Sequence, residues 1–125
     1  HKGKAEYKMA NYRQQEVQLT IENVRMNISL NVTNSIHRLQ TLKERKKIAH
    51  QSVLLAEETV SQELELLLNG KTTHTNLLEI QDDLSSARSR ELAAQIDVQK
   101  AHGELWAVTG ILLEKYGFLI NPKLN

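Results

Sequence analysis

Apolar residues recur every three or four positions along almost all of this 125-residue chain. This spacing follows the 3.6-residue turn of an α-helix and does not match the alternation of a β-strand. The single proline, Pro122, lies near the end, so no earlier residue forbids a helix. Aromatic residues make up only 4% of the chain, whereas compact cores draw heavily on large rings. The pattern therefore predicts an all-α protein of long helices.

The first predicted helix covers about residues 5–68 and carries one apolar stripe. Its members are Val17, Ile21, Val24, Ile28, Val32, Ile36, Leu39, Leu42, Ala49, Val53, Ala56, Val60, Leu64 and Leu67. The stripe skips one place, at Lys46. Weak helix formers between Asn27 and Ser35 make that stretch the softest part of the helix. A helix of roughly 60 residues spans about 90 Å, so we expect a rod.

A turn follows at the predicted tip, residues 69–74. Asn69-Gly70 is a strong stop signal, because glycine adopts the left-handed conformation that ends many helices. The next helix has three candidate caps: Thr72, Thr73 and Thr75. Thr75 or Asn76 together with Glu79 also resembles a capping box.

The second predicted helix covers residues 75–116, and an irregular tail covers residues 117–125. Two sets of positions repeat every seven residues: Ile80, Ala87, Ala94, Ala101 and Val108, and Leu84, Glu91, Val98, Leu105 and Leu112. A heptad register predicts a left-handed coiled coil. Glu91 is its one charged member, and two interpretations stay open. Its carboxylate reaches water at the edge of the seam, or it is buried against a Lys or Arg of a neighbour.

The short turn makes the two helices antiparallel neighbours. Folding the chain about residues 71–72 pairs Ala56 with Ala87 and sets Glu57 and Arg88 across one layer. The predicted packing residues of this seam are Val53, Ala56, Val60, Leu64, Ile80, Leu84, Ala87, Ala94, Val98, Ala101 and Leu105.

A second apolar set lies off the main seam. It comprises Leu30, Leu54, Leu55, Leu66, Leu68, Leu92, Ala93, Ile96, Trp106 and Leu113. A two-helix hairpin needs only one seam, and a helix with two apolar flanks usually packs against two neighbours. We therefore expect further helices, either from a larger protein or from copies of this chain.

Composition argues against several function classes. The net charge of +1 and the isolated basic run at residues 43–47 do not favour nucleic-acid binding. Absence of cysteine excludes thiolate chemistry. The histidines have no close metal-ligand spacing, so we expect no metal and no cofactor: His1, His37, His50, His74 and His102. The sequence predicts no loop-rich scaffold that could bring Ser, His and acidic side chains together in a catalytic site, so we expect no enzyme.

No apolar run approaches the ~20 residues of a membrane span. The chain opens at His1 without a signal sequence, and we expect it to be either a piece of a larger protein or a mature fragment.

The turn region carries a more specific pattern. Its matching residues are Gly70, Thr73, Leu77, Leu78, Glu79, Gln81, Leu84 and Ala87. They resemble the helix-turn-helix tip of TolC-type outer-membrane factors, where Gly, Ser or Thr, Leu-Leu-acidic, Gln, Leu and Ala recur at these spacings. The segments 5–19 and 103–113 are similar to the two ends of the same family's helices. Three positions depart from the pattern: Leu67, Asn76 and Ile80.

The resemblance implies a part of an outer-membrane efflux channel in a Gram-negative bacterium. A full-length member also has membrane strands and a second repeat, and this chain resembles the hairpin of the C-terminal repeat. Three such proteins would form an α-barrel ring in the periplasm, opened by an iris-like movement and working with a periplasmic adaptor and an inner-membrane pump. By position, the adaptor contacts would be Gly70, Lys71, Thr72, Thr73, Leu77 and Leu78.

Two simpler interpretations stay beside this one. Gly70 and Thr73 also serve as ordinary helix caps. The whole chain also fits a soluble coiled-coil scaffold or spacer with no transport role. The second apolar set and the tip pattern favour the channel.

A spin-label distance tests the hairpin directly. With Glu57 and Arg88 each replaced by labelled cysteine and diluted into unlabelled protein, we expect a separation below roughly 20 Å, two helix diameters. In one continuous helix the 31 intervening steps would put the labels about 46 Å apart. A long distance would mean that the chain does not reverse at Asn69-Gly70.

Overall fold

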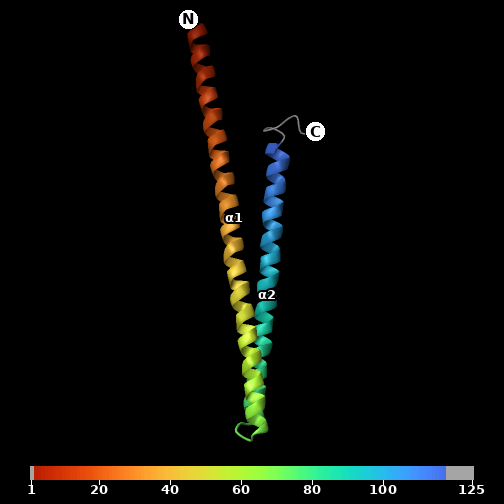
Figure 1. Cartoon of the computed structure of the whole chain (residues 1–125). Helices are drawn as coiled ribbons and strands as arrows, with labels where there is room; N and C mark the ends of the chain where they lie inside the picture. Colours follow the sequence, from red (N-terminus) through yellow and green to blue (C-terminus); the bar gives the residue numbers. More distant parts are fainter. Residues whose placement is uncertain (1, 118–125) are drawn as a thin grey trace. The chain divides into compact units, whose positions relative to one another are not determined.

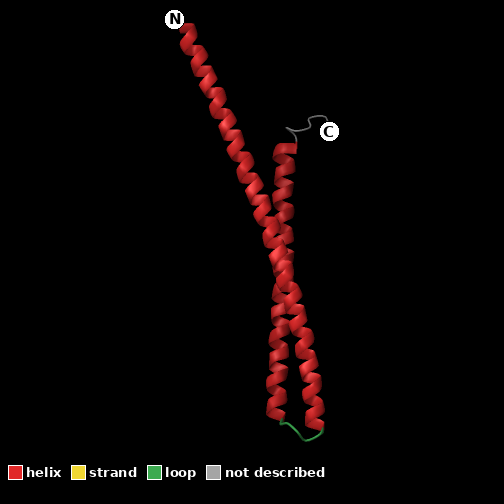
Figure 2. Ribbon diagram, turned by 60° about the vertical axis from the view of Figure 1, so that its left-hand side comes forward, coloured by secondary structure: helices red, strands yellow, loops and turns green. Residues whose placement is uncertain are grey.

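The computed structural model describes residues 2–117. Over this range the chain forms α1 (Lys2–Leu68), α2 (His74–Leu112) and one π-helical turn, η1 (Leu113–Gly117), with no strand (Figure 1). The predicted all-α hairpin is confirmed, since α2 runs back alongside residues 35–68 of α1 (Figure 2). α1 begins three residues before the predicted start, and α2 gives way to η1 four residues before the predicted end. The predicted tail beyond Gly117 lies outside the described residues.

The chain divides into two compact units at Asn34 and Ser35. In the first unit, α1 is exposed on every side from Lys2 to Asn23. The polar stretch between Asn27 and Ser35, predicted to be the softest, remains helical. The boundary between the units falls at the end of this stretch.

The second unit is held together by one apolar seam between α1 and α2. Its buried residues, all hydrophobic, are Leu39, Leu42, Val53, Leu77, Ala87, Val98 and Ala101. Four of them, with Leu105 packed against them, form one cluster: Leu39, Leu42, Val98 and Ala101. Half-buried positions continue the three-and-four spacing: Ala49, Ala56, Val60, Glu63, Leu67, Ile80, Leu84, Glu91, Ala94 and Leu105. This is the spacing of a left-handed helix pair.

One predicted seam residue lies elsewhere. Leu64 is 42% exposed, and Glu63 occupies the seam position instead. The reason is the period of the α-helix. Leu64 is eight residues after Ala56, and eight residues rotate about 80° further around the helix axis than two full turns. Steps of four and then three residues fall only about 20° short, so Val60, Glu63 and Leu67 stay on the seam.

Polar pairs across the seam define its register. Arg88 Nη2 lies 3.5 Å from Glu57 Oε1, so the two residues face each other across one layer as predicted. Arg38 Nη1 lies 3.5 Å from Glu104 Oε2. Exposed pairs of this kind contribute little free energy but report the alignment of the helices. The midpoint of each pair falls between residues 70 and 73, close to the predicted fold axis.

The one charged member of the α2 register has a partner that the sequence did not indicate. The Glu91 side chain is only 19% exposed, and its Oε1 lies 2.9 Å from Nδ1 of His50 on α1. Gln95 Nε2 lies 3.5 Å from the same oxygen. Glu91 is therefore neither free at the edge nor paired with a Lys or Arg; a half-buried carboxylate is satisfied inside the hairpin.

Two leucines of α1 offer a matched stability test. Leu42 is 9% exposed and Leu54 is 51% exposed, yet both sit in the same helix and lose the same side-chain atoms on replacement by alanine. We expect Leu42→Ala to lower the free energy of unfolding by about 2 kcal/mol and Leu54→Ala by less than about 1 kcal/mol. Urea unfolding followed by circular dichroism measures both, and equal losses would contradict the seam described above.

Candidate partner-binding tip

The end of α1 is closed by the left-handed glycine that the sequence predicts. Gly70 has φ +68°. Its N–H donates to the carbonyl of Leu67 at 3.0 Å, and the N–H of Lys71 donates to the carbonyl of Leu66 at 2.9 Å. These two bonds make a Schellman motif, which satisfies carbonyls that would otherwise lack partners. The backbone after Leu68 is therefore directed sharply back towards α2.

Of the three candidate caps, Thr73 is the one that caps the start of α2. Thr73 has extended backbone angles, and its hydroxyl accepts from the N–H of Asn76 at 3.2 Å. The N–H of Leu77 donates to the carbonyl of Thr73 at 3.2 Å, which begins the helix at His74. The predicted box with Glu79 does not form the cap. Because the first turn carries no acidic residue, the Thr73 cap matters more for this helix end.

A side-chain network links the turn to both helices. The Thr72 hydroxyl donates to Oε1 of Glu63 in α1 and accepts from Nδ2 of Asn76 in α2 at 3.2 Å. Thr72 and Glu63 are both half-buried. The hydroxyl therefore uses its donor and an acceptor site at once, and Glu63 is compensated at its place in the seam.

The structure separates the six predicted adaptor contacts into two groups. Gly70, Lys71, Thr73 and Leu78 are exposed, with Leu78 at 60%. Thr72 is half-buried, and Leu77 is buried at 9% exposure, so Leu77 packs inside the hairpin rather than on its surface. The sequence carried the signal for this placement, because Leu77 lies seven residues before Leu84 and extends the heptad register.

Leu68 was grouped with the second apolar set, but it lies at the tip. It is 86% exposed, the most exposed large hydrophobic residue among those described. A leucine directly before Asn69-Gly70 occupies the last helical position, where the seam has ended. The tip therefore presents Leu68 from α1 and Leu78 from α2, with Lys71 on the turn between them.

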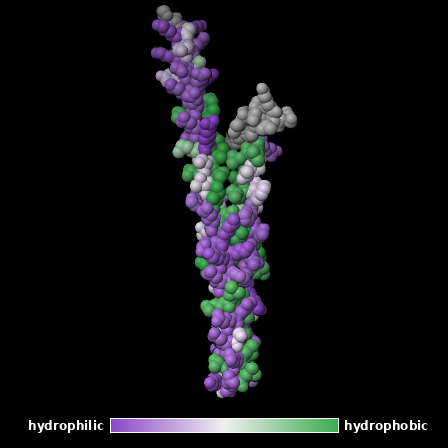
Figure 3. Space-filling model, viewed as in Figure 1, coloured by the Kyte–Doolittle hydropathy of each residue, from purple (hydrophilic) through white to green (hydrophobic). Residues whose placement is uncertain are grey.

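The rest of the hairpin also leaves apolar side chains uncovered. The members of the second apolar set that lie in this unit are all exposed: Leu54, Leu55, Leu66, Leu68, Leu92, Ala93, Ile96, Trp106 and Leu113. Figure 3 shows apolar patches on the hairpin surface at the tip and towards the end of α2. A shallow groove between the two helices has Ala56 and Ala87 among its lining residues. Uncovered apolar area on this scale is characteristic of a surface that packs against another protein.

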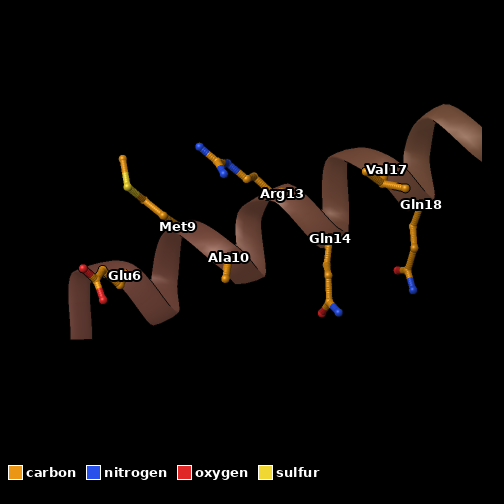
Figure 4. Close-up of a pocket in the computed structure, with 7 residues that line it drawn as sticks. All are labelled: Glu6, Met9, Ala10, Arg13, Gln14, Val17 and Gln18. Carbon is orange, nitrogen blue, oxygen red and sulfur yellow. The ribbon is translucent and has the colours of Figure 1, made fainter. Parts of the chain in front are cut away.

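The concavities seen along the described helices are open grooves. One open concavity follows a stretch of α1 and is lined by Glu6, Met9, Ala10, Arg13, Gln14, Val17 and Gln18. Figure 4 shows these side chains projecting from a single helix without converging on one point. Between residues 2 and 117 no three His, Asp or Glu side chains cluster to hold a metal ion. None of the helices in this range contains a hydrophobic stretch of the kind that spans a lipid bilayer.

Comparison with known proteins decides the family. The model of the family described as outer membrane efflux protein matches residues 2–111, which is most of the chain. The chain belongs to the outer membrane efflux protein family. Searches of curated proteins and of solved structures gave no match. The family is one of transport proteins and not of enzymes, and it favours the channel over the scaffold.

Two glycines of this efflux-family hairpin should respond oppositely to alanine. Gly70 needs φ +68°, where a side chain costs about 1–2 kcal/mol, so Gly70→Ala should destabilise the hairpin by about that amount. Gly103 lies inside α2 with open space around its Cβ position, so Gly103→Ala should stabilise by up to about 1 kcal/mol. Thermal unfolding of the two variants compares them. Equal effects would show that the turn does not require the left-handed glycine.

Proposed function

We propose that this hairpin forms part of the periplasmic wall of an outer-membrane efflux channel and docks a periplasmic adaptor through its tip. The observation that carries the proposal is the tip itself. It combines two strongly exposed leucines, Leu68 and Leu78, with a turn closed at both helix ends by hydrogen bonds. Exposed apolar residues on a rigid support are what a protein-binding surface requires, because little conformational entropy is lost on docking.

The uncovered flanks support the channel-wall part of the proposal. The exposed leucines of the second apolar set and the groove at Ala56 and Ala87 suit neighbouring helices on both sides of the hairpin. In the proposed assembly, hairpins of three full-length chains pack side by side in a ring. An inner-membrane pump completes the pathway through the adaptor.

The tip residues divide into contacts and supports in this proposal. Leu68, Lys71 and Leu78 meet the adaptor, because they are the long side chains exposed around the turn. Gly70 and Thr73 shape the backbone through the Schellman motif and the helix cap. Leu77 packs behind the tip and anchors the first turn of α2 in the seam.

Adaptor affinity tests the proposal. The probe is the purified periplasmic adaptor of the same bacterium's efflux system, and binding to the chain is measured by calorimetry. Leu68→Ser and Leu78→Ser should each weaken binding about tenfold or more, because burying a leucine is worth about 1.5–3 kcal/mol. Both residues are exposed, so the hairpin itself should keep its helical content.

Leu54→Ser is the matched control, since Leu54 is also an exposed leucine but lies four helical turns from the end of α1. It should leave adaptor affinity unchanged. If both tip variants bind as tightly as the unsubstituted chain, or if Leu54→Ser weakens binding equally, docking through the tip is wrong.

A further inference from the structure

We infer that Glu63, Thr72 and Asn76 form a clasp that holds the tip in its docking conformation, so that they are positioning residues for partner binding. The inference rests on the proposed docking function. It changes the part played by Thr72, which the sequence pattern placed among the adaptor contacts. The clasp acts on the partner through Leu68, Lys71 and Leu78, which it does not itself include.

The clasp joins three segments that the backbone bonds leave separate. The Schellman bonds tie Gly70 and Lys71 back to α1, and the cap bonds tie Thr73 forward to α2. Thr72 lies between these two sets. Its hydroxyl donates to Glu63, five residues before the end of α1, and accepts from Asn76 in the first turn of α2. One hydroxyl therefore couples the two helix ends.

Burial and charge make this coupling strong for a single hydroxyl. A hydrogen bond to a carboxylate is stronger than one between neutral groups. Glu63 is half-buried at a seam position, where a carboxylate without a partner would be costly. Removing the hydroxyl therefore leaves Glu63 uncompensated, and only the Schellman bonds of Gly70 and Lys71 then hold the turn to α1.

The position of the clasp connects it to docking. Lys71 is the residue directly before Thr72, and it is exposed. Leu68 and Leu78 stand on the two helix ends that the clasp couples. When the clasp is formed, the spacing and orientation of these three side chains are set before the partner arrives. A partner that binds a preorganised tip does not have to order it.

Thr72→Val removes the hydroxyl and keeps the shape of the side chain, and Thr72→Ser restores the hydroxyl. Two quantities are measured on the full chain: amide hydrogen exchange at Gly70 and Lys71 by NMR, and affinity for the purified adaptor. Thr72→Val should speed exchange at both amides and weaken adaptor binding, each about tenfold, as expected for losing a hydrogen bond to a charged group. Thr72→Ser should return both quantities to near the original values. The amide of Val98, in the distant part of the seam, should exchange at an unchanged rate in both variants.

Three results would overturn the inference. The first is unchanged exchange and unchanged affinity in Thr72→Val. The second is faster exchange with unchanged affinity, which would leave the clasp a purely structural feature. The third is a Thr72→Ser variant that behaves like Thr72→Val. Failure of the docking function is distinct, because then Leu68→Ser and Leu78→Ser would also leave adaptor affinity unchanged.

Discussion

The hairpin depends on one alternating seam, in which steps of three and four residues keep the same face of each helix towards its partner. Leu39, Leu42, Val98 and Ala101 form its main cluster, and Val53, Ala87 and Leu77 continue it towards the turn. In the main cluster, the small side chain of Ala101 on α2 lets the two backbones approach, and Leu39 and Leu42 on α1 fill the space between the helices. Because the seam is a single row, every other apolar side chain of the hairpin stays outside it. Both the stability of the hairpin and its surplus of uncovered surface follow from this geometry.

Polar residues that enter the seam do so with partners. Glu91 meets His50 and Gln95, and Glu63 meets Thr72. Each half-buried carboxylate would favour slippage or opening if it stood alone, because desolvation of an uncompensated charge is costly. His50 on α1 and Thr72 in the turn meet these carboxylates in only one alignment of the helices. The polar pairs thus make the register specific while the apolar residues supply most of the stabilisation.

In the proposed function, the tip and the flanks of the hairpin have separate roles. The flanks carry exposed leucines along the length of the hairpin, which suits lateral packing in the wall proposed for this member of the outer membrane efflux protein family. The tip carries Leu68 and Leu78 on a turn closed by the Schellman motif, the Thr73 cap and the Thr72 hydroxyl. Rigid support beneath exposed apolar side chains is the arrangement that lets a small surface bind with useful affinity.

The sequence by itself determined the helices, the place of the turn and most of the seam, because helical periodicity and the left-handed preference of Gly70 are local properties. It also indicated the uncovered second apolar set, since one seam cannot bury two flanks. Only the tertiary structure decided that Leu64 turns outward, and that Thr73 is the cap while Thr72 reaches Glu63. These outcomes depend on the rotation of each helix about its own axis relative to the other. A residue pattern restricts that rotation to an arc, and the contacts between the two helices then select one angle within it.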